Sequence, residues 1–171
     1  MNGQRSISDH EFGGTLTDLK LSIVEAYLRG FTTALSGKNF KLWYIDAFAG
    51  TGERTVRLEG RPATLLDTKM DERIERRRGS AQIAIDTAPA FDRLVFMDKK
   101  KRHVTALNAL KAAHPERDIT VVRGDANRAI QSEIDWSGWS RTRAVMFLDP
   151  YGMAVEWATL EAIQKTRAID L

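Results

Sequence analysis

The stretch YIDAFAGTG, residues 44–52, decides the fold, because it leads an apolar strand into an acidic residue and a Gly-x-Gly turn. The segment KLWYIDAF is bulky and apolar in close succession, which is typical of a strand buried on both faces of a parallel sheet. The glycines allow positive φ and a close approach of the backbone to a ligand. The turn lacks the third glycine of the dinucleotide fingerprint and the lysine of a P-loop. These residues therefore allow either a ligand-binding turn or a tight turn without a ligand.

Strand-like and helix-like segments alternate along the rest of the chain. Apolar runs favour strands and 3.6-residue spacing favours helices. We expect strands at residues 41–48, 92–98, 118–125, 142–152 (running into a turn) and 169–171 (the start of a fifth), and helices at 18–36, 79–88, 100–114, 126–134 and 156–168. This alternation predicts parallel β-α-β units, hence an α/β fold with a three-layer, Rossmann-like, mostly parallel sheet. In such sheets the ligand lies beyond the carboxyl ends of the strands.

The segment before the first strand has the pattern of a helix. Leu19, Ile23 and Tyr27 follow one another at helical spacing, and Thr17 is a candidate N-cap. The Ser-Gly pair at residues 36–37 is expected to end this helix.

Residues 53–78 have a different composition from the rest of the chain. They are rich in charges of both signs, contain Gly60 and Pro62, and show no sustained period. We interpret them as an inserted charged loop within a single domain that covers residues 1–171.

Two more strands end in an aspartate, and each of these aspartates can be interpreted either as a ligand contact or as a helix cap. Asp98 can accept both hydroxyls of a ribose, or it can cap the following helix. It lies farther from Asp46 than the nucleotide fingerprint requires, and the insert accounts for the excess. Asp125 can accept a hydrogen bond from an adenine amino group, or it can cap the helix at 126–134.

The fourth strand ends in Asp149-Pro150-Tyr151-Gly152, directly after AVMFL. Pro150 fixes its own φ and cannot donate to the ladder, so we expect its carbonyl and Asp149 to face the crevice. A carboxylate after five apolar residues needs a partner or solvent. Tyr151 offers a flat face for stacking. The alternative is a structural turn.

Composition excludes several classes of protein. The 171 residues contain no cysteine, which excludes disulfides, thiolate metal sites and cysteine nucleophiles. The three histidines lack metal-binding spacing, so we predict no metal. We find no apolar run of about 20 residues and no signal peptide, and therefore expect a cytoplasmic protein without a membrane contact.

The net charge of +3 permits a nucleic-acid partner without requiring one. Basic residues are dense at 76–78 and 99–102, and both clusters are predicted near the carboxyl end of the sheet. They can follow phosphates or form a solvated face. Trp136 and Trp139 flank the turn DWSGWS and are expected to pack a loop or to form a rim to the site.

The acid-ended strands together resemble those of S-adenosylmethionine-dependent methyltransferases with a Rossmann-like sheet. Over nearly the whole chain, the segments FGGTLTDLKLSIVEAYL, FKLWYIDAFAGTG, GSAQIAI and VMFLDPYGMAVEWATLEAI resemble the three-Cys-motif partner proteins, a bacterial and phage-associated family. That family is named for pairing with a separate three-cysteine protein that resembles a radical S-adenosylmethionine enzyme. The resemblance implies a methyltransferase-like fold with S-adenosylmethionine as the cofactor.

The resemblance also implies roles for individual residues. Asp46, Phe48, Gly50 and Gly52 would hold the methionine end of the cofactor. Asp98 would hold the ribose, and Asp125 with Ala126 would contact the adenine. The candidate catalytic residues are Asp149, Pro150 and Tyr151, in the place of the Asp-Pro-Pro-Tyr box of enzymes that methylate amino groups of nucleobases. This chain has one proline rather than two, and its aromatic residue comes third rather than fourth.

Two functions follow from the resemblance. The first is methyl transfer to an amino group of a nucleic-acid base. The second is a non-catalytic partner of the three-cysteine protein. The related folds have more strands than residues 1–171 supply, so we expect C-terminal strands to be missing and association through the open sheet edge to be available. A nicotinamide-dependent oxidoreductase ranks last, because the third glycine is absent.

Overall fold

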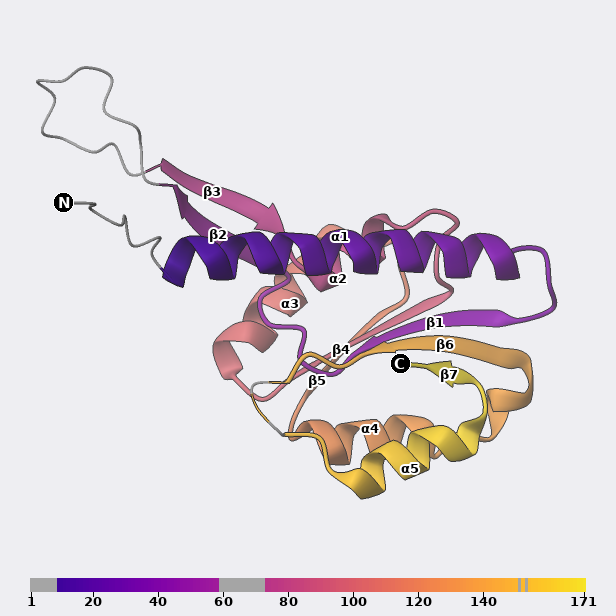
Figure 1. The fold of residues 1–171 in the computed structure, drawn as a ribbon. Helices are drawn as coiled ribbons and strands as arrows, with labels where there is room; N and C mark the ends of the chain where they lie inside the picture. The colour runs from indigo at the N-terminus through magenta and orange to yellow at the C-terminus, as the bar shows by residue number, and fades with distance from the viewer. Residues whose placement is uncertain (1–8, 59–72, 151, 153) are drawn as a thin grey trace, which may run out of the picture.

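The computed structural model describes residues 9–58, 73–150, 152 and 154–171. Its centre is a five-stranded, all-parallel sheet in the order β5-β4-β1-β6-β7 (Figure 1). The strands are β1 (Lys41–Asp46), β4 (Arg93–Asp98), β5 (Ile119–Arg123), β6 (Thr142–Phe147) and β7 (Ile169–Asp170). The helices are α1 (Asp9–Leu35), α2 (Ser80–Asp86), α3 (Lys101–Ala113), α4 (Ala126–Ile134) and α5 (Trp157–Thr166), with a short 3-10 helix η1 (Ser137–Arg141). The predicted α/β, three-layer, Rossmann-like fold is confirmed.

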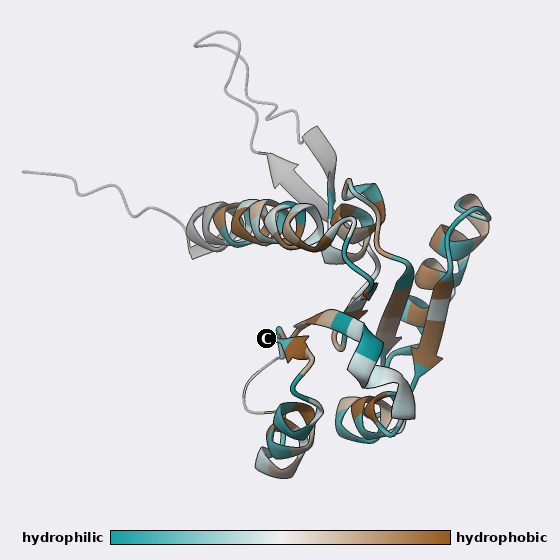
Figure 2. Cartoon of the chain, turned by 90° about the vertical axis from the view of Figure 1, so that its right-hand side faces the viewer, coloured by the Kyte–Doolittle hydropathy of each residue, from teal (hydrophilic) through white to brown (hydrophobic). Residues whose placement is uncertain are grey.

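Helices cover both faces of the sheet (Figures 1 and 2). On one face, Leu28 of α1, Ile83 of α2 and Leu107 of α3 pack with Tyr44 and Phe96 of the strands. These side chains are almost fully buried. Successive side chains along a strand point to opposite faces of the sheet, so the remaining strand side chains face the second helix layer.

The second face carries α4 and α5. Ile130 of α4 and Ile163 of α5 pack against Ile45, Met97 and Met146, the last three from β1, β4 and β6. Burial on both faces explains why the strands are apolar without alternation, as the sequence around residue 44 predicted.

The chain changes direction across the sheet at β1. It moves outward from β1 through β4 to β5, and then returns to the other side of β1 for β6 and β7. Asp46 is level with Phe96 of β4 and with Phe147 of β6. The carboxyl ends of β1, β4 and β6 therefore meet at the point where the strand order reverses, which is where open α/β sheets bind ligands.

Helix α1 differs from the prediction in its start and in its buried face. It begins at Asp9, so Thr17 lies inside the helix rather than at its N-cap. Leu19, Ile23 and Tyr27 are 58%, 61% and 48% exposed, whereas Leu28 is buried. The buried face consists of Leu21, Val24, Leu28, Phe31 and Leu35, which also have helical spacing. Two apolar faces on one helix look alike in the sequence, and only the position of the sheet selects between them.

Two side chains that flank this buried face of α1 reach the last strands of the sheet. The hydroxyl of Tyr27 donates a hydrogen bond to Asp170 of β7 at 2.9 Å. The ammonium of Lys20 pairs with Asp149, just after β6. These two contacts connect α1 to parts of the chain that are distant in the sequence.

The interpretation of residues 53–78 as a loop is wrong at both ends. Glu53–Leu58 (β2) and Arg73–Arg78 (β3) form a separate antiparallel pair, with Glu53 opposite Arg78. Backbone hydrogen bonds form this ladder, so it requires no apolar alternation, and a reading based on hydropathy missed it. Residues 59–72 lie outside the described part of the chain. None of the helices in the described part is long and apolar enough to span a membrane.

Candidate functional site

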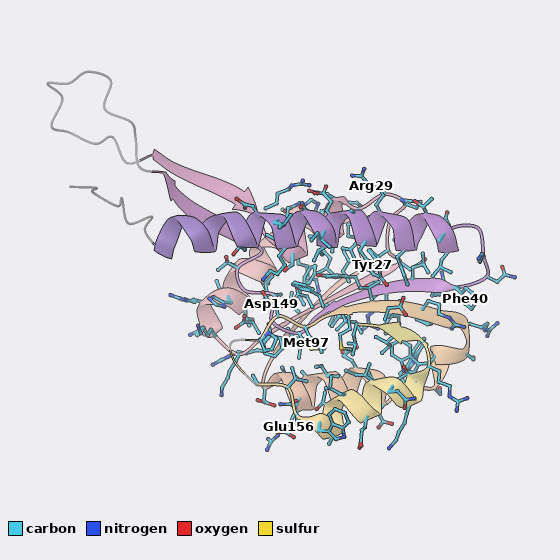
Figure 3. All side chains as sticks on the ribbon, viewed as in Figure 1. Tyr27, Arg29, Phe40, Met97, Asp149 and Glu156 are labelled. Atoms are coloured by element: carbon cyan, nitrogen blue, oxygen red, sulfur yellow. The ribbon has the colours of Figure 1, made fainter. Side chains whose placement is uncertain are left out.

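The four predicted strand-end aspartates lie along the carboxyl edge of the sheet. Asp46 ends β1 and Asp98 ends β4, while Asp125 and Asp149 follow β5 and β6. The turn after β1 is attached to its neighbours on both sides. Ala47 N–H donates to the carbonyl of Phe147 at 3.2 Å, and Ala49 N–H donates to that of Met97 at 3.0 Å. The turn therefore lies across the ends of β4 and β6 (Figure 3).

Asp46 is a fully buried carboxyl group within this edge. It accepts hydrogen bonds from the Phe48 N–H at 3.1 Å and the Tyr44 hydroxyl at 3.3 Å. Burial raises its pKa to about 6, although hydrogen bonds from Ser80, Phe48 and Tyr44 act in the opposite direction. The negative charge of Asp149 adds to the rise in pKa. A carboxyl group with a raised pKa at a strand end is a frequent property of functional sites.

Asp98 joins the glycine turn to α3. Its Oδ2 accepts from the Gly50 N–H at 3.1 Å and lies 2.9 Å from Nδ1 of His103. Its Oδ1 accepts from the Lys100 N–H at 2.7 Å. Two carboxylate oxygens offer about four acceptor positions, so one position is left for a ligand. Sequence analysis assigned no role to His103. Its place in the first turn of α3, shortly after a strand-end acid, was the available signal.

Gly50 and Gly52 both have positive φ, at +63° and +75°, as the turn predicted. They differ in what surrounds them. A Cβ on Gly50 would meet nothing within 4 Å, so Gly50 borders open space. A Cβ on Gly52 would lie 2.9 Å from Cδ2 of Leu110 in α3. Gly50 fits the predicted ligand contact, and packing against α3 accounts for Gly52.

Alanine substitutions should separate these two roles. Gly50→Ala should lower the free energy of unfolding by about 1–2 kcal/mol, the cost of a left-handed backbone for an L-residue. Gly52→Ala should lower it by about 2–4 kcal/mol, because overpacking against Leu110 adds to that cost. Urea unfolding of both variants tests this order. Equal losses would show that the contact with Leu110 has no energetic weight.

Asp125 serves as the N-cap of α4, which is one of the two readings that the sequence allowed. Its Oδ1 accepts from the N–H groups of Asn127 and Arg128 at 3.1 and 3.4 Å. Its Oδ2 makes no hydrogen bond with another described residue and is available for a ligand. Ala126 is the first residue of α4 and follows Asp125 at the same edge.

Asn127 is a buried residue that the sequence did not single out. Its Nδ2 donates to the carbonyl of Ala154 at 3.0 Å. Its Oδ1 accepts from the Glu156 N–H and the Thr159 hydroxyl, each at 2.9 Å. The side chain thereby joins α4 to the segment between Asp149 and α5. A buried amide with three partners fixes the position of that segment.

Asp149 and Pro150 lie at the carboxyl edge, as predicted. Oδ2 of Asp149 pairs with Nζ of Lys20, and both side chains are partly exposed at 49% and 40%. Tyr151, the third candidate catalytic residue, lies outside the described residues. Lys20 is 129 residues away in the sequence, which is why no local motif could predict it.

The basic clusters have separate roles. Lys99, Lys100 and the first residues of α3 follow β4 at the carboxyl edge and are exposed. In the other cluster, Arg78 pairs with Glu25 at 3.1 Å and with Asp86 at 3.2 Å, so it joins β3 to α1 and α2.

The fold is that of an α/β protein with a Rossmann-like parallel sheet. The carboxyl edge of this sheet carries a candidate ligand site at the topological switch point. No protein-family model matches this sequence, and no curated protein matches it. Among solved structures, protein LPL1258 from Legionella pneumophila str. Philadelphia 1, of family DUF519, is similar with a TM-score of 0.61 and 16% identity. The match covers 87% of this chain and 65% of that protein, so this chain spans about 65% of its length. This likeness supports the fold alone.

Proposed function

We propose that this protein is an S-adenosylmethionine-dependent methyltransferase that acts on an amino group of a nucleic-acid base. The observation that supports the proposal best is the hydrogen bond from the Gly50 N–H to Asp98 at the switch point. It joins an open, positive-φ turn after β1 to an acid at the end of β4. A nucleoside cofactor needs a close backbone approach and a ribose acceptor side by side, and this pair supplies both.

The residues at the edge fit the cofactor. The turn around Phe48 and Gly50 would hold its methionine end, above the buried Asp46. The free acceptor position of Asp98 would bind a ribose hydroxyl, and Oδ2 of Asp125 would accept from the adenine amino group. When bound, the cofactor supplies the activated methyl group, and the protein supplies position and electrostatics.

Asp149 and Pro150 would position the methyl acceptor. The Asp149 carboxylate and the Pro150 carbonyl can each accept one N–H of an exocyclic amine, which directs the nitrogen lone pair toward the methyl group. Lys20 occupies Oδ2 of Asp149, so Oδ1 is the oxygen available to the amine. A base in a duplex must be flipped out to reach this edge, which costs a few kcal/mol.

Calorimetric titration with S-adenosylmethionine tests the cofactor site. We expect the unaltered chain to bind, and Gly50→Val and Asp98→Ala to abolish binding. Gly37→Val is a matched control, because Gly37 also has positive φ, at +75°, and open space around it, but lies after α1. Asp118→Ala is the control for the loss of one negative charge, because Asp118 is an exposed carboxylate that precedes β5 at the other end of the strands. Failure of the unaltered chain to bind, or equal losses in the controls, would contradict the cofactor site.

Asp149→Ala tests the acceptor site separately. It should abolish methyl transfer to a single-stranded nucleic acid while leaving cofactor affinity unchanged. The pair with Lys20 is exposed, so its loss should alter stability by at most about 1 kcal/mol. Transfer at the original rate would remove Asp149 from the proposal.

The exposed stripe Leu19-Ile23-Tyr27 of α1 supports a second candidate, a non-catalytic partner of a three-cysteine protein. Contiguous apolar side chains on a surface favour protein contacts. A pull-down with such a protein should survive Asp149→Ala and fail with Leu19→Glu combined with Ile23→Glu. Complex formation that the stripe variant does not alter would rule out this surface.

A further inference from the structure

A groove of about 750 Å³ lies at the amino end of the sheet, opposite the candidate site. Its walls include Lys38, Asn39 and Phe40 before β1, Lys41 at the start of β1, and Trp136 and Arg141 around η1. Figure 3 shows Phe40 and Asp149 at opposite ends of the sheet. The six residues of β1 correspond to about 20 Å, so a ligand in the groove does not touch Asp46.

The groove is basic. Three of its lining residues are cations, Lys38, Lys41 and Arg141, and none is a carboxylate. Lys41 pairs with Asp92 at 3.4 Å, and the other oxygen of Asp92 accepts from the Leu42 N–H. Lys38 and Arg141 are exposed and make no ion pair with another described residue. The groove therefore presents two cations that no carboxylate of the described chain neutralises.

The groove also has an aromatic wall that packing holds in place. Trp136 is 42% exposed, yet its indole stacks on Trp43 at a centroid distance of 4.7 Å. Trp139 meets both rings edge-on. Gly138 lets the chain pass close to Trp136, because a Cβ there would lie 2.1 Å from its ring. This explains the DWSGWS turn, in which Trp139 is buried and Trp136 faces solvent.

We propose that this groove binds single-stranded nucleic acid, with a base against the exposed part of Trp136 and phosphates on Lys38 and Arg141. A basic groove with an exposed, rigidly held aromatic ring is the usual arrangement for sequence-tolerant binding of single strands. Most of the lining side chains are exposed, so the groove is an open trough that a polymer can cross rather than a closed pocket for a small molecule. The proposal does not depend on the cofactor site.

Fluorescence anisotropy with a labelled oligothymidylate of about 12 nucleotides tests the groove without any cofactor. Lys38→Glu combined with Arg141→Glu should weaken binding about tenfold or more at low salt. The slope of log K against log salt should fall by about 1.4, which corresponds to two lost phosphate contacts on a single strand. Lys111→Glu combined with Lys165→Glu is the matched control, because these exposed lysines lie on α3 and α5 and the change in net charge is identical.

Trp136→Phe should reduce the quenching of intrinsic fluorescence by the oligonucleotide and leave the salt slope unchanged, because the phosphate contacts persist. No binding, or equal weakening in the groove variant and its control, would overturn the proposal. A thymidine mononucleotide that binds as tightly as the oligomer would assign the groove to a free nucleotide instead. Equal competition by polyglutamate would assign it to acidic protein segments.

Discussion

Replacing Asp46 with Asn should increase the free energy of unfolding by up to about 3 kcal/mol at neutral pH. The pKa of Asp46 is about 6 in the folded protein, compared with an ordinary value of 3.8 for an aspartate, and each pKa unit corresponds to about 1.36 kcal/mol. Burial is the main cause, so the ionised form of this side chain is a cost to the fold. Asn is neutral at every pH and its oxygen can still accept from the Phe48 N–H.

The gain should depend on pH in a defined direction. A carboxyl group whose pKa is raised on folding binds more protons in the folded state, so stability falls as pH rises between the two pKa values. The stabilising effect of Asp46→Asn should therefore be fully present above about pH 6 and disappear below about pH 4. Urea unfolding of both proteins at several pH values measures this difference.

Asp118→Asn is the control for this experiment, because Asp118 is an exposed carboxylate on the same chain. It should change stability by less than about 0.5 kcal/mol at each pH. A loss of stability for Asp46→Asn at neutral pH, or a gain that stays constant down to pH 4, would contradict the account of the buried charge. Under the proposed function, the same variant should bind S-adenosylmethionine more weakly, which would make Asp46 a residue kept at the expense of stability.

Asn127→Ala should lower the free energy of unfolding by about 2–4 kcal/mol, which is large for one polar side chain. The substitution leaves the buried Thr159 hydroxyl, the Glu156 N–H and the Ala154 carbonyl without their partner. It also frees the segment that follows Asp149, so methyl transfer should fall further than cofactor binding does. Urea unfolding and amide hydrogen exchange at Glu156 measure the two effects.

Asn108→Ala provides the comparison. Asn108 is exposed on α3, where its amide donates to the Val104 carbonyl at 3.0 Å. Its removal should change stability by less than about 0.5 kcal/mol and leave exchange at Glu156 unaltered. If both variants lose the same free energy, the three hydrogen bonds of Asn127 do not hold the segment.

The sheet could be predicted because the composition of its strands reflects their burial on both faces. The run from Leu42 to Ile45 is apolar at every position, which only burial on both faces requires. Helix α1 could be predicted to exist, but not to bury Leu28 rather than Ile23, because both lie on apolar stripes with the same spacing. The β2–β3 pair was missed for a different reason, since its charged sequence gives no periodic signal.

Those features of the candidate site could be predicted that depend on the backbone conformation or the strand position of a single residue. The positive φ of Gly50 and the strand-end place of Asp98 follow from local sequence and sheet topology. Lys20, His103 and Asn127 could not be assigned, because their contacts depend on which helix lies over which strand end. Oδ1 of Asp125 caps α4, whereas Oδ2 makes no hydrogen bond with another described residue. This difference between the two oxygens depends on hydrogen-bond geometry, which the sequence does not contain.

The reach of α1 across the sheet has a consequence for the order of folding. The helix is synthesised early, yet Lys20 pairs with a residue 129 positions later and Tyr27 with one 143 positions later. The parallel pairing of β1 with β6 is similarly distant in the sequence. Closing such long loops costs entropy before any contact repays it, and chains rich in distant contacts fold slowly. During synthesis, Lys20 and Tyr27 therefore remain without these partners until the residues after β6 and in β7 have been made. Incompletely packed intermediates of this kind are prone to aggregation.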